Sequence, residues 1–354
     1  MAAFTEIDNP ELYFQAKAYT GNGSSSHAIT FDNTDTSMQP DLVWIKNRNN
    51  AEDNVIFDSV RGGTKRLYSN GNHVEGTNDA INSFDSNGFN LNTASSLNYN
   101  TYTYVAWCWK GGTTSGITTN GSTTITPAGY SFSATSGVSI VKYAGNGSSG
   151  AKYPHGLGVT PKMVMVKNLG TTDWWNVHHT SLGNNSEMYL NTTDAAPATS
   201  GNGTTPDSVN IDLEGTGTAH NGSSNNYIAY VFADVQGFSK FGSYEGNGNA
   251  NGPFVYLGFR PAYVMYKPAD SADNWEIHDN KRDTINPMET LLYANLNNAE
   301  GGPSGVTDRL DFLSNGFKIL DSGGHINTSG NKYIFMAFSE APFCNSSGVP
   351  CNAR

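Results

Sequence analysis

The chain has 354 residues, enough for two or three domains that each bury a core of their own. Charged residues make up 14 % of it against about 25 % in an average protein, whereas aromatic residues reach 12 % and glycine occurs 39 times. The aromatic content excludes a disordered chain, and a net charge of −11 without a basic run argues against nucleic-acid binding. Scarce helix formers beside plentiful β-branched, aromatic and turn residues predict an all-β fold.

The N-terminal residues contain one short segment with helix signals. Asp8 or Asn9 is placed to cap a helix and Pro10 suits its first turn, so the sequence predicts a short helix that continues to Gln15. The chain shows neither the pattern of a secretion signal nor an apolar stretch near the roughly 20 residues of a membrane span. We therefore expect a protein without a leader and without a membrane span.

Beyond this segment, three landmarks occur in a fixed order, and the whole set occurs three times. The landmarks are Tyr-x-Gly-Asn-Gly (19–23, 143–147 and 244–248), Pro-x-x-Val-x-x-Lys (40–46, 161–167 and 261–267) and an aromatic-apolar closing run (104–109, 227–232 and 333–338). A unit of about 100 residues is longer than the roughly 20–50 residues of a solenoid repeat. The pattern therefore favours tandem domains.

Each landmark is typical of a strand or a turn. A proline is tolerated at the first residue of a strand, and the apolar run after it does not alternate, which indicates a strand covered on both faces. The Gly-Asn-Gly segments indicate turns, and the closing run indicates a central strand. Residues 84–89 and 312–317 share Phe-x-Ser-Asn-Gly-Phe, which predicts a hairpin with a two-residue Asn-Gly turn. The second copy lacks this feature.

Between the first and second copies, residues 111–137 are rich in Gly, Ser and Thr and predict a linker with one short strand near 129–133. The sequence thus predicts three tandem antiparallel β-sandwich units, jelly-roll-like, with a short N-terminal helix or arm. The expected boundaries are 1–112 for the arm and first unit, 113–236 for the linker and second unit, and 237–354 for the third unit and C-terminal tail. Whether neighbouring units share strands stays open.

The histidines come nearest to a functional site in a chain without familiar catalytic motifs. No Gly-x-Ser-x-Gly, Walker A, His-Glu-x-x-His or Cys-x-x-Cys pattern occurs. His178 and His179 follow Trp174 and Trp175, a combination able to bind a metal or to stack on a sugar. Because His278 matches His178 in the third copy, we interpret these histidines as packing residues of a repeated strand. We expect no catalytic residue, no metal site and no cofactor.

Pairs of acidic residues offer the other candidate chemistry, since a glycosidase needs two carboxylates about 5–10 Å apart. The candidate pairs are Asp32/Asp35, Asp207/Asp212 and Asp308/Asp311. Most of these residues stand beside Asn, Ser and Thr, where aspartate commonly forms turns, and the same interpretation applies to oxygen-rich loops that would suit calcium. Asn-Gly-Ser triplets begin at Asn22, Asn120, Asn146 and Asn221 and match a glycosylation pattern, but this composition makes turns the simpler interpretation.

The chain contains three cysteines. Cys108 lies between two tryptophans and is expected to behave as a small buried apolar residue. Cys344 and Cys351 are near enough along the chain to form a disulfide, and this alternative stays open. Assembly in the cytoplasm favours free thiols.

Several stretches of the sequence resemble a family of virion proteins from marine bacteriophages. They are residues 13–15, 19–23, 40–48, 57–62, 104–107, 237–248, 279–283, 312–317, 337–340 and 352–354. The resemblance covers nearly the whole chain. It implies a particle component of the kind described as tail-fibre-like or generic structural protein, and it brings no site residues with it, so the ligand-binding residues are unknown at this point.

Together these observations predict a non-enzymatic structural protein on the exterior of a phage particle, assembled in the host cytoplasm. The favoured role is a tail fibre or receptor-binding component. The expected partners are other virion proteins of the tail or capsid, further copies of the chain and a host surface glycan or receptor. One alternative is a capsid decoration (cement) protein that docks through one unit or through residues 4–14. A more distant alternative is a polysaccharide-degrading enzyme of the tailspike kind.

Overall fold

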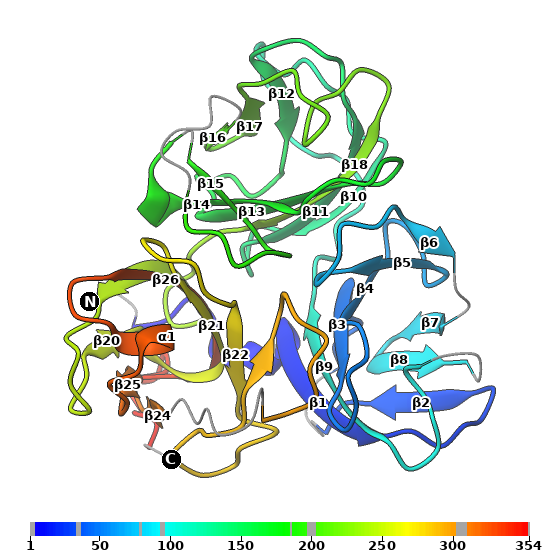
Figure 1. The fold of residues 1–354 in the computed structure, drawn as a ribbon. Coiled ribbons are helices and arrows are strands. Elements are labelled where there is room, and N and C mark those ends of the chain that lie inside the picture. The colour runs from blue at the N-terminus through cyan, green and yellow to red at the C-terminus, as the bar shows by residue number, and fades with distance from the viewer. Residues whose placement is uncertain are drawn as a thin grey trace.

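The structure is a computed structural model that describes residues 4–32, 37–77, 80–92, 96–184, 186–196, 203–301 and 310–352. Its strands form antiparallel sheets, as the composition predicts, and the sheets remain open. They group into three units that follow one another along the chain and lie around a common centre (Figure 1). No helix in the described part of the chain is long and apolar enough to cross a membrane.

The first unit contains a six-stranded sheet and a three-stranded sheet. Its strands are β1 (Phe14–Thr20), β2 (His27–Thr30), β3 (Leu42–Asn47), β4 (Val55–Asp58), β5 (Lys65–Tyr68), β6 (Gly76–Thr77), β7 (Ile81–Asp85), β8 (Gly88–Leu91) and β9 (Thr103–Trp109). The large sheet has the order β1-β9-β3-β4-β5-β6, and the small sheet has the order β2-β8-β7.

The second unit repeats this plan. Its strands are β10 (Gly129–Ser133), β11 (Val138–Ala144), β12 (Ala151–Pro154), β13 (Met163–Asn168), β14 (Asn176–His179), β15 (Glu187–Tyr189), β16 (Thr204–Pro206), β17 (Asn210–Leu213) and β18 (Asn226–Phe232), with the short helix η2 (Thr180–Leu182) after β14. The sheets have the orders β10-β11-β18-β13-β14-β15 and β12-β17-β16. Strand β10 is the short strand that the sequence predicts inside the linker.

The third unit has one strand fewer in its large sheet. Its strands are β19 (Ser239–Glu245), β20 (Phe254–Tyr256), β21 (Phe259–Pro268), β22 (Glu276–Asp279), β23 (Leu292–Tyr293), β24 (Leu310–Leu313), β25 (Gly316–Ile319) and β26 (Lys332–Pro342), and the helix α1 (Gly324–Asn327) precedes β26. The sheets have the orders β19-β26-β21-β22-β23 and β20-β25-β24. Each of the six sheets thus takes its strands from one unit, which answers the open question about shared strands.

Each unit has the character of a sandwich because apolar side chains from its two sheets meet in a separate cluster. In the first unit Val43 and Phe57 of the large sheet pack with Phe89 and Leu91 of the small sheet. Corresponding clusters fill the third and second units. Burial of such side chains contributes about 1.5–3 kcal/mol each.

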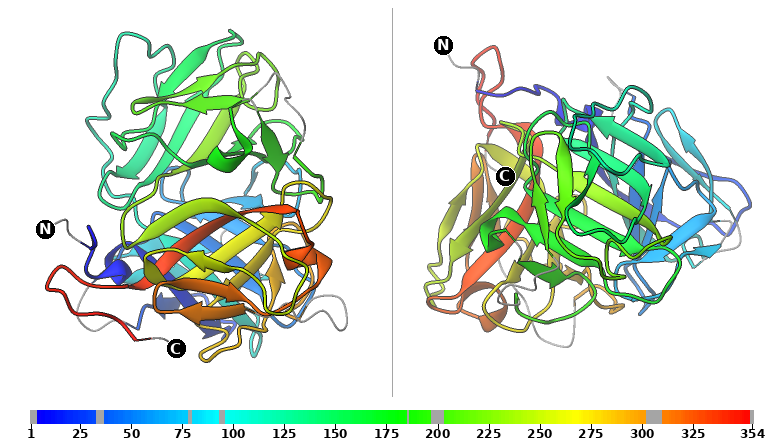
Figure 2. Two further views of the ribbon diagram at one scale, coloured as in Figure 1. Left: turned by 90° about the vertical axis from the view of Figure 1, so that its left-hand side faces the viewer. Right: turned by 90° about the horizontal axis from the view of Figure 1, so that it is seen from above.

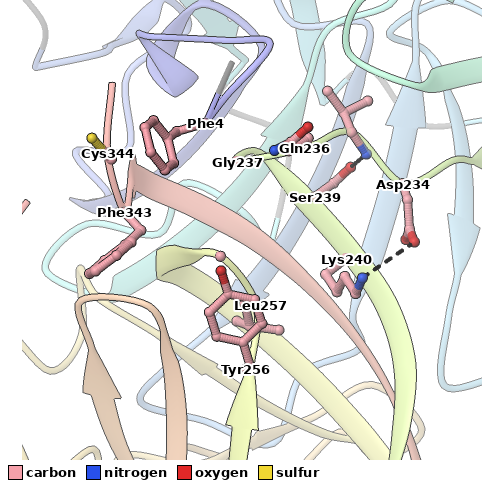
Figure 3. A pocket seen from close by; sticks show the side chains of 12 residues that line it. Phe4, Asp234, Gln236, Gly237, Ser239, Lys240, Tyr256, Leu257, Phe343 and Cys344 are labelled. Carbon is pink, nitrogen blue, oxygen red and sulfur yellow. Dashed lines mark hydrogen bonds and ion pairs between the residues drawn. The ribbon is translucent and has the colours of Figure 1, made fainter. Parts of the chain in front are cut away.

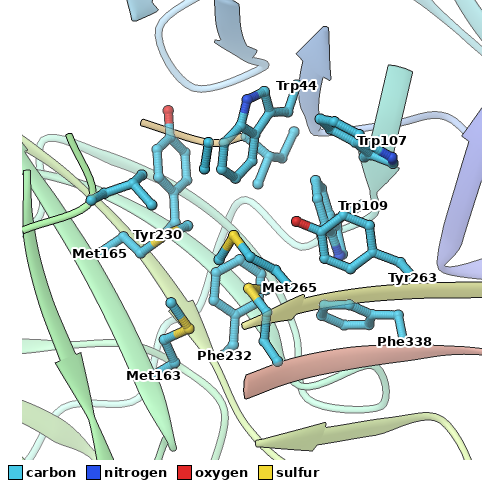
Figure 4. Packing of buried hydrophobic residues seen from close by; sticks show 14 of the residues in the cluster. Trp44, Trp107, Trp109, Met163, Met165, Tyr230, Phe232, Tyr263, Met265 and Phe338 are labelled. Atoms are coloured by element: carbon cyan, nitrogen blue, oxygen red, sulfur yellow. The ribbon is translucent and has the colours of Figure 1, made fainter. Parts of the chain in front are cut away.

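A fourth cluster lies at the centre of the molecule and contains side chains from all three units (Figure 4). Among its members are Trp44, Trp107, Trp109, Met163, Met165, Tyr230, Phe232, Tyr263, Met265 and Phe338. On β3, Val43 and Ile45 belong to the first sandwich, whereas Leu42 and Trp44 belong to this central core. The Pro-led strands lack polar alternation because both of their faces are buried.

Repeated hydrogen bonds close the three units into a ring. Glu75 N donates to Leu169 O (3.0 Å), Ala196 N to Ala269 O (2.8 Å), and Glu300 N to Arg48 O (2.9 Å). The acceptors occupy the same position, two residues after the lysine of the Pro-led landmark, in the second, third and first units. The contact between the first and third units therefore uses the same geometry as the contacts between units adjacent in sequence.

The Tyr-x-Gly-Asn-Gly landmark is explained by one arrangement that all three units share. Tyr19 stacks on Tyr104 with ring centroids 5.0 Å apart, and equivalent pairs occur in the other units. A Cβ at Gly21 would lie 2.2 Å from Tyr99 O, so only glycine fits there. Gly23 has φ +68, a left-handed conformation that favours glycine. The landmark thus reflects packing of the backbone against the loop before the closing strand.

Two local predictions need correction. The N-terminal helix is the three-residue turn η1 (Pro10–Leu12) capped by Asn9, and Phe14 and Gln15 belong to β1 because Phe14 is needed in the central core. The predicted Asn-Gly turn is also wrong. Asp85 pairs with Gly88, so the loop is Ser86-Asn87, and Gly88 begins β8. A Cβ on Gly88 would lie 2.0 Å from Ile29 O, so the glycine serves the close approach of β2.

Candidate ligand-binding site

A pocket of about 280 Å³ lies where the second and third units meet both ends of the chain (Figure 3). Four segments line it: the connection from β18 to β19, the turn from β20 to β21, the residues after β26, and Phe4 of the N-terminal arm. Figure 2 shows the arm and the segment after β26 side by side, and Ser346 N donates to Asp8 Oδ1 at 2.7 Å. The pocket therefore depends on segments that are distant from one another in the sequence.

The connection from β18 to β19 is a hydrogen-bonded turn that forms one wall. Val235 N donates to Ser239 Oγ (3.0 Å), and Ser239 Oγ donates to Ala233 O (2.9 Å). The N-terminal arm docks on the outside of this turn, where Glu6 N donates to Gln236 O (3.1 Å). These bonds hold the wall in place before any ligand arrives.

Three aromatic side chains at the pocket are exposed to solvent, which is unusual for such large apolar groups. Tyr256 is 61 % exposed, Phe4 57 % and Phe343 37 %. They come from three different segments, and Figure 3 shows Tyr256 and Phe343 on the same side of the pocket. Exposed aromatic faces that gather at a concave surface are typical of sites for sugar rings or aromatic side chains.

A carboxylate and an ammonium group supply the polar part of the pocket. Asp234 Oδ1 accepts from Phe241 N at 2.8 Å, and Asp234 Oδ2 lies 3.9 Å from Lys240 Nζ. Burial raises the pKa of Asp234 above its ordinary value. Among the described lining residues Asp234 is the one carboxylate, whereas glycoside hydrolysis commonly needs two. This arrangement suits binding through stacking and hydrogen bonds.

The histidines singled out from the sequence lie inside the protein, away from this pocket. His178 and His179 are in β14, and burial lowers the pKa of both to about 4. His179 Nε2 lies 3.0 Å from Phe335 O, and its Nδ1 accepts from Ser181 N. His278 is buried in β22 at the matching position of the third unit, and its pKa is lowered by burial to about 3. Trp174, by contrast, is 48 % exposed and packs on Tyr189.

The acidic candidates serve turns and ion pairs. Asp32 pairs with Lys17 and Asp212 with Lys152, while Asp207 Oδ1 accepts from Val209 N and Asn210 N. Asp311 lies on β24, where burial raises its pKa. Asp35 and Asp308 lie outside the described residues. None of the described members lines the pocket.

The Asn-Gly-Ser triplets and the cysteines also have local roles. Asn22, Asn120 and Asn146 each accept a hydrogen bond from the backbone N–H two residues later, which is the turn that the composition predicts, and Asn221 is fully buried. Cys108 is a buried free thiol. Cys344 and Cys351 are free as well, and Cys351 Sγ donates to Ser314 O at 3.1 Å.

Sequence reasoning missed the pocket because its parts are distant along the chain and follow no period. Phe4, Tyr256 and Phe343 stand in segments without a motif. The one available signal was the expected boundary at residue 237, where the third unit follows the second without a linker. No short sequence pattern shows that Phe4 and Phe343 pack beside the connection from β18 to β19.

Comparison with known proteins gives a family and no further relative. No curated protein and no solved structure matches the sequence. A family whose description is "Domain of unknown function (DUF7483)" matches residues 9–342, which include all the sheets described above. The chain therefore belongs to the DUF7483 family.

Proposed function

We propose that this chain is a non-enzymatic structural protein on the exterior of a bacteriophage particle and that it contacts the host surface as a tail-fibre or receptor-binding component. The resemblance of its repeated segments to virion proteins of marine phages supports the particle location. The observation that carries the contact with the host is the pocket with three exposed aromatic side chains beside Asp234 and Lys240. Its ligand class is a surface carbohydrate.

The ring supports such a role through rigidity. The units share a central core and repeat the same cross-unit hydrogen bonds, so the pocket stays formed without a ligand. A preformed site loses less conformational entropy on binding than a flexible loop does. A single small pocket binds a sugar weakly, and several copies of the chain on one particle raise the overall affinity.

A glycan array probed with the full chain tests the binding role. We expect Tyr256→Ala and Phe343→Ala to reduce bound signal about five- to thirtyfold, because loss of a stacking face removes about 1–2 kcal/mol. Tyr99→Ala is the matched control, since Tyr99 is 47 % exposed and belongs to the first unit. Equal binding by all three variants, or no glycan bound at all, would count against a carbohydrate receptor.

A second role, capsid decoration, is favoured by the arrangement of three similar units around one centre. At positions of local three-fold symmetry on an icosahedral capsid, three subunits meet around one axis. A ring of three similar units could place one unit on each of these subunits. Cryo-electron microscopy of intact particles separates the two roles, because density on the capsid faces would refute the tail location and density at the tail would refute decoration. Release of sugar fragments from host polysaccharide would instead favour the enzyme alternative.

A further inference from the structure

The third unit brings an imidazole and two carboxylates together on the side chains of Asp273, Glu276 and His325. One ligand atom from each lies within 4.8 Å of the other two. The three residues come from different places: Asp273 precedes β22, Glu276 is its first residue, and His325 is in α1. None of them lines the pocket described above or belongs to the sequence-based candidates.

The spacing of these atoms suits a single metal ion. His325 Nδ1 lies 2.9 Å from Asp273 Oδ2, close to the separation of two ligands on one ion. Zinc bonds to histidine nitrogen and carboxylate oxygen measure about 2.0–2.2 Å, so two ligands on one ion lie roughly 3–4 Å apart. Side-chain movements of less than about 1 Å would bring all three atoms to that distance.

Neighbouring groups hold the carboxylates in place, as outer groups do around metal sites. Tyr266 Oη donates to Glu276 Oε2 at 2.5 Å, and His278 Nε2 lies 3.4 Å from the same Tyr266 oxygen. Glu276 itself is 1 % exposed, whereas the side chain of His325 is 39 % exposed. The cluster is therefore fixed on its inner side and open to solvent on its outer side.

The second unit carries a related set, and two of its three members stand at matching positions. Asp173 and Asn176 correspond to Asp273 and Glu276, six and nine residues after the lysine of the Pro-led landmark. Tyr143 Oη donates to His220 O as Tyr244 Oη donates to Ile326 O, which places His220 one residue from the position of His325.

The imidazole of His220 gives an independent sign of a missing ligand. Both ring nitrogens are buried, and neither has a hydrogen-bond partner among the described residues. The second unit therefore holds a buried imidazole whose nitrogen atoms are available as metal ligands.

The first unit has lost this chemistry, which separates it from the ordinary needs of the fold. Glu52 and Val55 match Asp273 and Glu276, and Val55 is apolar and buried. Tyr19 Oη donates to Leu97 O, so Leu97 matches Ile326 and Ser96 stands at the position of His325. The sandwich thus forms without the polar set. The fold of a unit therefore does not require the imidazole and the second carboxylate that the third unit has.

We propose that Asp273, Glu276 and His325 bind one divalent transition-metal ion, with Zn²⁺ as the representative. One nitrogen and two oxygen donors suit Zn²⁺, Co²⁺ or Ni²⁺, whereas Ca²⁺ requires six to eight oxygen ligands. The second unit offers a weaker counterpart, because the neutral amide of Asn176 replaces the carboxylate of Glu276. The ion joins the loop before β22 to α1 and leaves a coordination position towards solvent.

Calorimetric titration of the metal-stripped full chain with ZnCl₂ tests the proposal. The Cys351→Ser background removes the partly exposed thiol, which also has affinity for zinc. We expect one high-affinity ion per chain, no heat with millimolar CaCl₂, and affinity at least about tenfold lower in His325→Ala and Asp273→Asn. His73→Ala is the matched control, because His73 is exposed and lies in the first unit.

Absence of saturable Zn²⁺ binding, or binding that His325→Ala and Asp273→Asn leave unchanged, would overturn the proposal. Circular dichroism of each variant checks that the fold is intact. X-ray absorption of the zinc-loaded wild-type chain gives a second readout that needs no variant. One imidazole with oxygen neighbours supports the site, and sulfur neighbours would refute it.

Discussion

Three junctions join the units of the ring, and at each of them the last residue of a matching strand makes a polar contact with the next unit. That residue is an aspartate at two junctions and a histidine at the third. Asp58 at the end of β4 accepts from Tyr230 Oη of the second unit (2.7 Å), and Asp279 at the end of β22 accepts from Trp107 Nε1 of the first unit (3.0 Å). Each aspartate also pairs with an arginine three residues later. At the matching place between the second and third units stands His179, whose Nε2 faces Phe335 O.

The ring therefore has a polar contact at each junction, and this contact involves a charged pair at two junctions and a neutral imidazole at the third. The Asp58–Arg61 pair has both side chains fully buried. Removing one partner of such a pair leaves a buried charge without compensation, which is costly. The neutral imidazole of His179 avoids that cost but makes its junction sensitive to acid.

Loss of the aspartate at a charged junction should damage the protein most. We expect Asp58→Ala to lower the free energy of unfolding at pH 7 by about 3–5 kcal/mol, because the Arg61 guanidinium remains buried without its partner. Urea denaturation measures the change. Asp32→Ala is the control, since Asp32 is 62 % exposed in its ion pair with Lys17 and should cost at most about 1 kcal/mol. Equal losses in the two variants would contradict the assigned role of the buried pair.

Acid should weaken the neutral junction. Burial lowers the pKa of His179 to about 4, so the unfolded chain binds its proton near pH 6.5 while the folded chain does not. Stability is therefore lost as pH falls from about 6.5 to 4, by about 3 kcal/mol for this residue. Four other buried histidines, His155, His178, His220 and His278, add to the loss.

The variant His179→Gln isolates this contribution. Urea denaturation at pH 6.5, 5.5 and 4.5 should give a slope against pH that is smaller by about one proton than in the wild type. His73→Ala, at an exposed histidine, should leave the slope unchanged. An unaltered slope in His179→Gln would show that this junction is not the acid-sensitive one.

Lysines common to all three units should act in the opposite pH range. Lys46, Lys167 and Lys267 are fully buried, and burial lowers the pKa of each to about 8. Each donates to a backbone carbonyl of another unit, at Asn297, Asn72 and Thr193 respectively. Above pH 8 the folded chain releases these protons while the unfolded chain retains them to about 10.5, so stability rises with pH in that window.

One lysine should account for about 2 kcal/mol of the rise between pH 8 and 9.5. Replacing Lys167 by Met should remove that share, and Lys332→Met, at an exposed lysine, should not. Guanidinium denaturation at pH 7.5, 8.5 and 9.5 measures both slopes. Stability that stays level or falls across this range in the wild type would contradict the account.

The smallest effect is expected at the rim of the junction between the third and first units. Arg48 and Glu300 form a two-pronged ion pair, with Nε–Oε1 at 2.9 Å and Nη2–Oε2 at 2.7 Å, and both side chains are about one-fifth exposed. A double-mutant cycle with Arg48→Ala and Glu300→Ala should give a coupling energy of about 1 kcal/mol. A coupling energy near zero would show that only the buried charge pairs stabilise the ring.

The sequence predicted what depends on local signals. The Pro-led strands, the closing strands, the β10 strand and the three-fold repeat all rest on neighbouring residues or on a repeated pattern, and the all-β fold class is confirmed. The predicted Asn-Gly turn was misplaced by one residue, because Gly88 belongs to a strand and lies against the backbone of β2, which is distant in sequence. The short N-terminal helix was overextended because the central core needs Phe14 in a strand.

The central core and both candidate sites lay beyond sequence reasoning for a related reason. Trp44, Met165 and Tyr263 read as ordinary strand residues, and nothing local says that they meet at one place. The pocket depends on Phe4 and Phe343 coming together, and the proposed metal site depends on His325 lying against β22. Burial on both faces of the Pro-led strands was the one visible hint of contacts between units.

Differential scanning calorimetry of the full chain tests most directly the claim that the three units form one closed ring around a shared core. Because each unit supplies side chains to that core, the loss of one unit exposes apolar surface of the other two. We expect a single transition whose calorimetric and van't Hoff enthalpies agree. Two or three resolved transitions, each with the enthalpy of a unit of about 100 residues, would show independent sandwiches and contradict it.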